Sequence, residues 1–574
     1  MCISDRERAV ALTRRGSARL LTSSASAASP GFSKTAAILP QRAVPIAGLL
    51  ALECLGTSGL AIALSLGRRG WYGVVAGICV ALTFVLRVRG RTIATLLVSR
   101  FRFWWTRRQR THTAQHFEPF DFQLSDGSLM GFHWDGRVLT ASMRIQEKPH
   151  ALTVMDRAGI VSGEVISVRM LADCLRQFDI TLDSIDIISQ GARSRGHGQL
   201  AATYDALLGP LPAIAVRSVL VTVRLDPTLC PEAVRNRGGG WDGILRTAVI
   251  ATRRVANKLS DTGLRPQILP AREVSLATDE LLDGLGLAAL EEKWLVCRRG
   301  RFQVRSFALR PALFTTAGLA RLWAVPSYST TLCVSLRRDE HSGFVALRGL
   351  TRFSRHGRVR VPLRGLSELR GAQYAALVCS LPVPSPRRSI QQWFVGKTED
   401  AVEGLVLPAY GCGQLLGADE HDRAVALTLF GPNIGRVEMY GTLHLAQQVV
   451  LRALALGARI RVHTNRIDGW SAMVRQVGDE SFLRIGAGGR SASSEYSVEM
   501  FDGVAEHSVR PGVTTMVINP SQARPSQQPD VTMRLLDEDR DTVHVETNSG
   551  STIVTMVTTD DEMRYLRPSF TMGD

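Results

Sequence analysis

The stretch VPIAGLLALECLGTSGLAIALSL, from Val44 to Leu66, is followed four residues later by WYGVVAGICVALTFVL, from Trp71 to Leu86. The first stretch has 23 residues with one formal charge, at Glu53, and the second has 16 residues with none. At about 1.5 Å per residue, helices of these lengths would measure about 34 Å and about 24 Å, against a hydrocarbon core of about 30 Å. Because backbone amides inside lipid have no water to bond, both stretches are predicted to be helices. The sequence therefore predicts a transmembrane helical hairpin over 37–90.

Positive charge on either side of this hairpin predicts its orientation. Five arginines lie between residues 87 and 102, whereas the turn between the two helices holds only Arg68 and Arg69. Positively charged residues are retained on the cytoplasmic side of a membrane. Both termini are therefore predicted to be cytoplasmic, and the protein is predicted to be a multi-pass protein of the plasma membrane.

Several residues of the hairpin suggest contacts with other membrane components. Trp71 and Tyr72 are typical interfacial anchors and would offset the shortness of the second helix. Gly73 and Gly77 form a GxxxG pattern, which lets another helix approach closely. Glu53 would lie near the middle of the bilayer, where a carboxylate needs a partner or a proton. We expect these residues to pack against helices of other subunits.

The excess of positive charge is concentrated beside the predicted membrane segment. The chain has a formal net charge of +17, and residues 1–110 hold 17 basic and 3 acidic residues, a net charge of +14. This placement favours anionic lipid head groups as the partner and argues against nucleic acid. The basic juxtamembrane segment 91–116 includes Trp104 and Trp105, which are predicted interfacial anchors. The run 87–110 is interpreted as an interfacial amphipathic helix or as a stop-transfer flank, and residues 1–36 as a disordered leader.

The remainder of the chain has the pattern of a layered α/β body, predicted to be cytoplasmic and to contain two subdomains. Runs of β-branched residues predict strands, and apolar residues at helical spacing predict helices. The predicted boundaries are 117–380 for the main α/β domain, 381–390 for a Pro-rich linker, 391–490 for a second α/β unit and 491–574 for an acidic β or flexible tail. The predicted strands are 138–145, 185–188, 216–225, 425–430, 436–440 and 459–463, and the predicted helices are 165–178, 243–264, 443–456 and 469–477.

Motifs for nucleotide or metal chemistry are incomplete. Gly396-Lys397-Thr398 lacks the glycine that a phosphate-binding loop has five residues earlier. The segment 436–456 has a strand–loop–helix layout, but its Gly441-Thr442-Leu443-His444 loop lacks the Gly-Lys-Ser/Thr sequence that neutralises and positions phosphate. His112 and His116 have no third ligand nearby. The sequence predicts no catalytic residue, no metal ligand and no cofactor.

One enzymatic alternative stays open at this point. Asp537 and Asp539 form a DxD pattern, which could hold a divalent ion in a membrane-bound nucleotide-sugar transferase or another nucleotide-binding enzyme. Such a dense acidic run is more often a solvated loop, because like charges resist burial.

A basic stretch in the main α/β domain is a candidate docking surface for an acidic partner, although a solvated sheet face would have the same composition. Its residues are Arg348, Arg352, Arg355, Arg358, Arg360 and Arg364.

A succession of short motifs gives the chain a family resemblance. After the hairpin and its basic exit come FHWDG (132–136), DIISQG (186–191), VTVRLDP (221–227) and EEKW (291–294). Over about 40–480, this order resembles the EccE component of the mycobacterial-type ESX (type VII) secretion systems. The resemblance implies a core subunit of an inner-membrane assembly that also contains EccB, EccC and EccD. It further implies a non-catalytic scaffold, because EccC is the ATPase of such an assembly.

Overall fold

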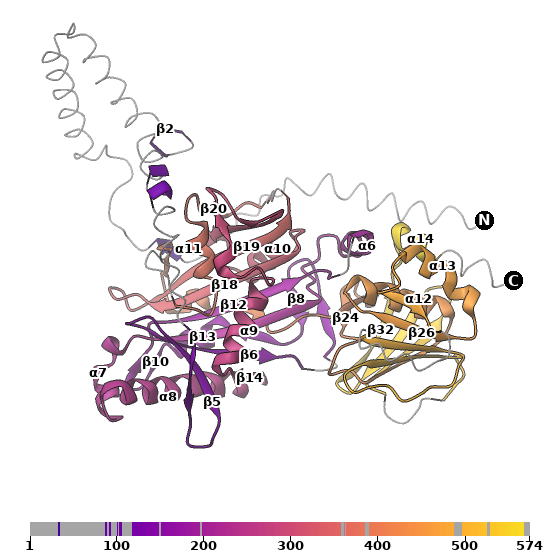
Figure 1. Cartoon of the computed structure of the whole chain (residues 1–574), viewed down its shortest axis with the longest axis horizontal. Helices are drawn as coiled ribbons and strands as arrows, with labels where there is room; N and C mark the ends of the chain where they lie inside the picture. Colours follow the sequence, from indigo (N-terminus) through magenta and orange to yellow (C-terminus); the bar gives the residue numbers. More distant parts are fainter. Residues whose placement is uncertain are drawn as a thin grey trace, which may run out of the picture.

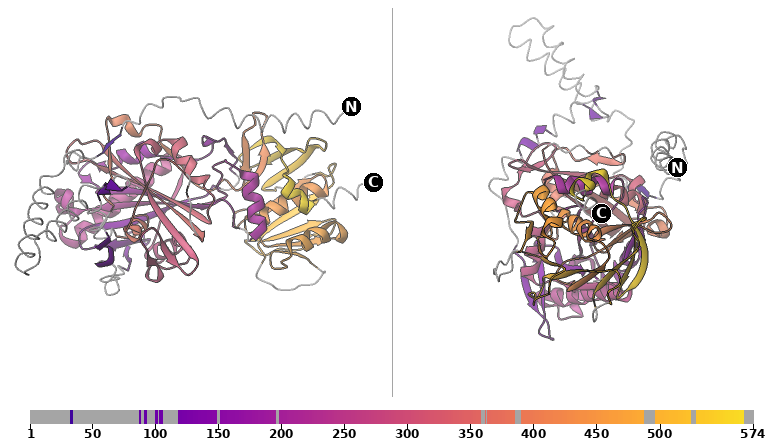
Figure 2. Two further views of the ribbon diagram at one scale, coloured as in Figure 1. Left: turned by 90° about the horizontal axis from the view of Figure 1, so that it is seen from above. Right: turned by 90° about the vertical axis from the view of Figure 1, so that its right-hand side faces the viewer.

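A computed structural model describes most of the chain after residue 117. The described residues are 118–148, 151–195, 198–357, 361, 363–384, 390–486, 496–524 and 529–566, with short pieces at 32–34, 87–88, 91–92, 100–101 and 103–105. They form two lobes that lie side by side along the long axis of the molecule (Figures 1 and 2). Each lobe combines a sheet with helices, in agreement with the predicted mixed α/β class.

The predicted transmembrane helices, 44–66 and 71–86, lie outside the described residues. Among the residues that the structure describes, no helix combines the length and the hydropathy needed to cross a bilayer.

The first lobe is built on an antiparallel sheet whose strands are paired in an order unlike their order in the chain. The central strands are rich in apolar and β-branched residues, which favour strands, with single polar residues between them. In spatial order the strands are β15 (Glu291–Glu292), β16 (Cys297–Arg299), β17 (Phe302–Leu309), β19 (Val345–His356), β18 (Ser329–Arg338), β12 (Ser184–Ala192), β13 (Val216–Leu225), β6 (Leu139–Gln146), β5 (Leu129–Trp134) and β4 (Phe120–Gln123). Short strands extend this sheet at its margins: β14 (Arg265–Ile268), β20 (Leu366–Glu368) and β21 (Phe394–Gly396).

Helices cover both faces of this sheet. One face packs on α8 (Gly240–Asp261) through a largely apolar layer that includes Val221 and Leu332. The other face packs on α9 (Ala271–Leu281) and α11 (Gln373–Val378). Shorter helices close the ends of the lobe: α5 (Val168–Asp173), α7 (Pro231–Arg235), α10 (Thr316–Trp323) and the 3-10 turns η1 (Pro227–Leu229), η2 (Leu287–Ala289), η3 (Pro311–Leu313) and η4 (Glu399–Val402). The long central strands are therefore buried on both sides.

The second lobe contains a sheet that is half parallel and half antiparallel. The parallel part runs in the order β27 (Leu483–Ile485), β26 (Ile460–Thr464), β28 (Val498–Asp502), β29 (Thr514–Asn519), β25 (Arg436–Tyr440) and β30 (Val531–Asp537). The antiparallel part continues with β31 (Thr542–Thr547), β32 (Gly550–Met556), β23 (Gln414–Ala418), β24 (Ala424–Leu427), β7 (Thr153–Met155) and β8 (Ile160–Ser162).

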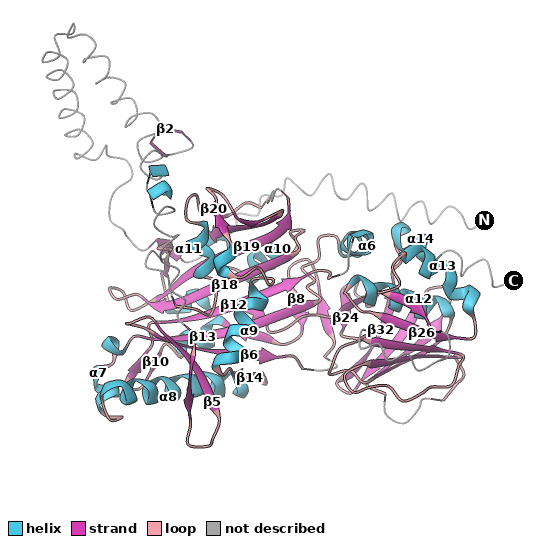
Figure 3. Cartoon of the chain, viewed as in Figure 1, coloured by secondary structure: helices cyan, strands magenta, loops and turns pink. Residues whose placement is uncertain are grey.

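The helices of the second lobe gather on one face of its sheet. These are α12 (Leu443–Ala455), α13 (Ile467–Val477) and α14 (Asp560–Leu566), whose apolar side chains share a core with alternate strand residues such as Val462 and Met500 (Figure 3). Side chains on a strand alternate between the two faces, so Arg461 and Glu499 lie on the opposite face. In the described residues, loops and not helices run over that opposite face (Figure 3).

Two segments of the first half of the chain belong to the second lobe. Strands β7 and β8 extend its sheet by pairing with β24. Helix α6 (Gly198–Leu208) packs against α12 and α14. At this junction the hydroxyl oxygen of Tyr204, on α6, accepts a hydrogen bond from the Leu415 backbone N–H at 2.9 Å. The lobes are thus tied together by exchanged elements.

These pairings correct several sequence predictions. The second unit does not begin at residue 391, because β21 pairs with β19 and β22 (Val406–Pro408) pairs with β9 (Val165–Ser167), both within the first lobe. Of the two alternatives for 491–574, an acidic β or a flexible tail, the β alternative is confirmed, but the region is no appendage, because its strands β28 to β32 are integral to the second sheet. The helix predicted over 165–178 is interrupted, since β9 precedes the short α5.

The N-terminal predictions also need correction where the structure describes them. Residues Phe32–Lys34, within the predicted disordered leader, form β1 antiparallel to β21. Residues Arg87–Val88 and Arg91–Thr92 form the paired strands β2 and β3, so an amphipathic helix does not run continuously over 87–110. The helical residues described there are 100–101 and 103–105.

Candidate functional site

The family-like motifs converge on the polar but buried face of the first sheet. DIISQG lies on β12, VTVRLDP ends β13, and FHWDG ends β5. Arg224 Nε donates to Asp186 Oδ2 at 2.7 Å, and the two side chains are only 4% and 1% exposed. Arg224 also donates to Thr140 Oγ1 at 3.4 Å and to the Val383 carbonyl at 3.0 Å. A buried ion pair needs such additional hydrogen bonds to offset its lost hydration.

His133 lies on β5, two strands from β13 in the sheet, and is 4% exposed. Burial, together with the positive charge of Arg224, lowers the pKa of His133 to about 4. The imidazole is therefore neutral at physiological pH, so Arg224 meets no second positive charge here.

The remaining motif residues build turns. Asp226 caps η1 by accepting from the Thr228 N–H at 2.9 Å, and it accepts from Arg137 Nε at 2.7 Å. Asp135 accepts from the Val138 N–H at 2.6 Å within the turn between β5 and β6. These aspartates therefore fix the chain where strands end, as is typical of turn-forming residues.

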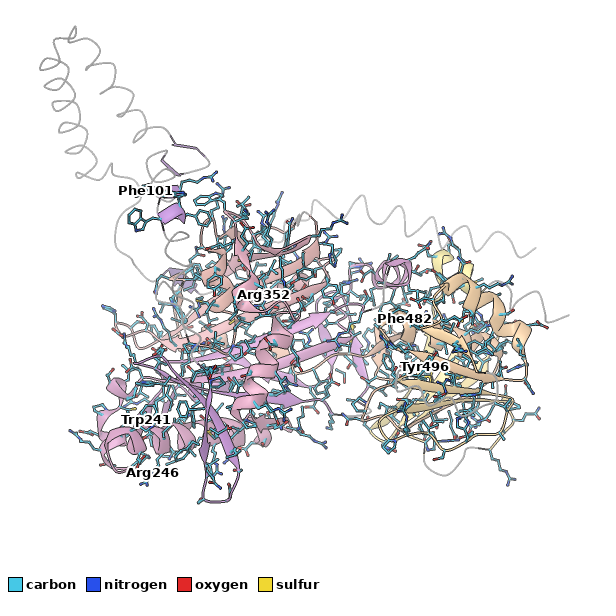
Figure 4. The ribbon with its side chains drawn as sticks, in the orientation of Figure 1. Phe101, Trp241, Arg246, Arg352, Phe482 and Tyr496 are labelled. Carbon is cyan, nitrogen blue, oxygen red and sulfur yellow. The ribbon has the colours of Figure 1, made fainter. Side chains whose placement is uncertain are left out.

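The structure corrects part of the predicted basic docking surface. Arg348 and Arg352 lie on β19, 5% and 3% exposed, because both faces of this strand are covered. Arg348 donates to Ser335 Oγ at 2.9 Å, and Arg352 donates to Thr331 Oγ1 and Ser380 Oγ, each at 3.0 Å. Figure 4 shows Arg352 within the first lobe. These two arginines are internal hydrogen-bond donors and cannot contact a partner.

The other predicted members of that surface lie in different surroundings. Arg355 is half-buried and Arg364 is exposed, whereas Arg358 and Arg360 lie outside the described residues. Arg364 thus stays available as a surface cation, and docking there stays a prediction.

The strand–loop–helix of the second lobe is confirmed as β25 followed by α12. The Gly441 N–H bonds the Asn519 carbonyl at 3.1 Å, and Thr442 caps α12 without a side-chain hydrogen bond. At the end of β28, two strands from β25 in the sheet, Asp502 is fully buried and accepts from Thr464 Oγ1 and Trp470 Nε1, each at 2.8 Å. The edge that holds phosphate in nucleotide-binding α/β folds is thus occupied by internal contacts of this protein.

The remaining motif candidates are local turns. Asp537 Oδ1 accepts from the N–H groups of Asp539 and Arg540 at 3.0 and 3.2 Å, within the β30–β31 hairpin. Gly396 ends β21, directly before η4. The segment 409–413 connects the lobes, and there a side chain at Gly411 would stand 2.3 Å from the Ala215 carbonyl oxygen. His112 and His116 lie outside the described residues.

The predicted anchors Trp104 and Trp105 belong to a short aromatic segment against the first lobe. Both are about half exposed, at 52% and 51%, and Phe101 is 62% exposed and projects from the body (Figure 4). Phe103 packs edge-on against Trp294 of the EEKW motif, with ring centroids 5.5 Å apart. Trp294 of the motif thus packs against the segment that follows the predicted hairpin. The other aromatic side chains of that segment stay exposed. Glu53, Trp71, Tyr72, Gly73 and Gly77 lie outside the described residues.

Sequence reasoning missed two side-chain groups in the second lobe. Arg452 on α12 and Glu562 on α14 form a buried ion pair with Nε and Oε1 2.9 Å apart. His463, Glu499 and His507 form a cluster on the face opposite the helices. Neither group has a short sequence signature, because its members lie 36 or more residues apart or, like His507, come from a loop. The alternation of polar and apolar residues along β26 and β28 was the one available signal, and it indicated only a polar face.

The motifs therefore stabilise the interior and turns of a mixed α/β protein. Residues 213–309, which span β13 to β17, match the family described as "Putative type VII ESX secretion system translocon, EccE". The resemblance to the EccE family is thereby confirmed.

Curated relatives agree with this assignment. The chain is 27% identical over 197 residues to the ESX-1 secretion system protein EccE1 of Mycolicibacterium smegmatis, covering 34% of this chain and 42% of the relative. It is 27% identical over 345 residues to EccE5 of Mycobacterium marinum, covering 56% and 81%. It is 24% identical over 342 residues to EccE2 of Mycobacterium tuberculosis, covering 59% and 61%. The match thus spans less than half of the first relative and more of the others.

Proposed function

We propose that this chain is a non-catalytic, membrane-anchored scaffold subunit of a type VII ESX secretion complex. The observation that carries the proposal is the match of residues 213–309 to EccE, because this region supplies β13, α8, α9 and β17, whose side chains enter the core of the first lobe. Such a framework would hold surfaces in fixed positions for other subunits.

The state of the nucleotide-binding edge supports a role without catalysis. The Gly441 N–H donates a hydrogen bond to the Asn519 carbonyl. The Asp502 carboxylate accepts hydrogen bonds from Thr464, Trp470 and Arg466. The transferase alternative loses its support, because the Asp537 carboxylate accepts hydrogen bonds from backbone N–H groups of its own hairpin. Energy for export would then come from another subunit, and the resemblance points to EccC.

The anchoring part of the proposal combines the hairpin with the aromatic segment. The spans 44–66 and 71–86 would place both termini in the cytoplasm, and exposed Phe101, Trp104 and Trp105 would meet the interface of the inner membrane. Phe103 and Trp294 would join this membrane-facing segment to the body. Anionic lipids and the EccB, EccC and EccD subunits are the proposed partners, with no role for nucleic acid.

The experiment is affinity purification of the full chain from native membranes in a mild detergent, followed by identification of the co-purifying proteins. We expect EccB-, EccC- and EccD-type subunits in the same high-molecular-mass fraction. Recovery of the chain by itself, from cells that produce the other subunits, would contradict the scaffold role.

A pair of glycine substitutions tests the membrane contact. Gly73→Leu combined with Gly77→Leu should release most of the chain from the purified complex, because leucine side chains keep a partner helix from close approach. The chain itself should stay in the membrane fraction. The matched control is Val75→Leu with Cys79→Leu, which adds bulk on the opposite side of the same predicted helix. Equal co-purification of both variants would show that the glycines make no such contact.

A further inference from the structure

We infer that His463, Glu499 and His507 form a binding site for a divalent transition metal ion, with Zn²⁺ as the best-matched ion. One ligand atom from each of the three side chains lies within 4.8 Å of the other two. Two imidazoles and one carboxylate are ligands that Zn²⁺ prefers, and three protein ligands leave a position for water or a further donor.

Two neighbouring parallel strands provide the first two ligands. His463 comes from β26 and Glu499 from β28, and the register places Arg461 beside Glu499 and His463 beside Phe501. All four side chains therefore lie on the face of the sheet away from the helices. His463 Nε2 and Glu499 Oε2 are 2.7 Å apart, so the two ligand atoms already face each other.

The third ligand is on the loop that follows β28, and this loop is held in position. Glu506, next to His507, bonds the Arg436 guanidinium in a bidentate manner at 2.6 and 2.9 Å. The Phe501 ring stacks on His463 and meets His507 edge-on, each with centroids 4.9 Å apart. The two imidazoles thus share one aromatic wall that restricts their orientation.

A glycine and an arginine complete the surroundings. A side chain at Gly486 would stand 3.0 Å from Cε1 and Nδ1 of His463, so glycine lets this edge of the imidazole lie against the backbone. Arg461 Nη1 lies 3.8 Å from Glu499 Oε1, the oxygen that does not face His463. The Arg461 guanidinium also stacks on Tyr496, at 4.5 Å, which holds it beside the site (Figure 4 labels Tyr496).

Metal binding requires only a small rearrangement. Donor atoms around a tetrahedral Zn²⁺ are about 3.3 Å apart, because Zn–N and Zn–O distances are about 2.0–2.2 Å. The distance between His463 Nε2 and Glu499 Oε2 would increase by a few tenths of an ångström. The exposed His507 would move inward with its loop. The ion would then fasten the 503–513 loop to β26, on the face that loops cover.

The test is a titration of the untagged full chain, freed of metal by a chelator, with Zn²⁺ followed by calorimetry and with Co²⁺ followed by visible absorption. We expect one ion per chain at micromolar or lower Kd, the absorption of a tetrahedral Co²⁺ with nitrogen and oxygen ligands, and a rise in Tm of a few degrees.

Three single variants and a control decide the assignment. His507→Gln, in an exposed loop, and His463→Gln or Glu499→Gln should each weaken Zn²⁺ binding by at least about tenfold. His544→Gln removes a half-buried imidazole from β31 of the same sheet and should leave the Kd unchanged. No binding by the parent chain, or equal binding by the His507→Gln variant with unchanged circular dichroism, would overturn the proposal. Either result would leave the scaffold role unaffected.

Discussion

Replacing Glu562 with alanine should lower the free energy of unfolding of the second lobe by about 3–5 kcal/mol, because the Arg452 charge would stay buried without its partner. Arg452 and Glu562 are 1% and 2% exposed in their side chains. Arg452 also donates to the Leu416 carbonyl at 2.7 Å and to the Val557 carbonyl, and these contacts keep the guanidinium in the interior. Urea denaturation, with hydrogen exchange of α12 amides to isolate the second lobe, measures the loss.

Two further variants separate the loss of the pair from a local effect on α14. Asp561→Ala changes the neighbouring residue, whose ion pair with Arg564 is exposed, and should cost less than about 0.5 kcal/mol. The double variant Arg452→Met with Glu562→Leu removes both charges and should recover most of the stability. If Glu562→Ala is as mild as Asp561→Ala, the pair does not stabilise the lobe.

The second large effect is a loss of stability in acid that originates at His133. Burial lowers the pKa of His133 from 6.5 to about 4, with a further contribution from Arg224. Between pH 6.5 and pH 4 the unfolded chain binds a proton at this residue while the folded chain does not. Stability is therefore complete above pH 6.5 and falls as the pH drops, by about 3 kcal/mol in total.

The measurement compares the free energy of unfolding at pH 7 and pH 4 in the parent chain and in His133→Gln. Glutamine does not titrate, so the variant should lose about 3 kcal/mol less over this interval. Exposed His341 provides the matched control, since His341→Gln should follow the parent chain at every pH. An identical pH dependence of the parent and His133→Gln would show that His133 is protonated without cost.

Local sequence patterns predicted many elements because these depend on neighbouring residues. The ranges 216–225 and 436–440 coincide with β13 and β25, which are rich in β-branched and apolar residues. The apolar spacing of 443–456 similarly predicted α12 to within one residue.

Such local patterns could not predict which distant segments pair with one another. The second lobe takes β7 and β8 from residues 153–162, and the pairing of β21 with β19 moves the start of that lobe to about residue 414. Arg348 and Arg352 show the same limit for side chains. In a chain rich in arginine, only the hydroxyl and carbonyl acceptors supplied by β18 and the end of α11 distinguish a buried guanidinium from an exposed one.

The exchange of β7 and β8 has a mechanical consequence. The polypeptide crosses between the lobes five times: after β6 and back after β8, after β12 to α6 and back before β13, and finally after β22. A load applied to either lobe is shared by these five covalent crossings, so the two lobes should resist twisting relative to each other. Cleavage at any single crossing would leave four intact.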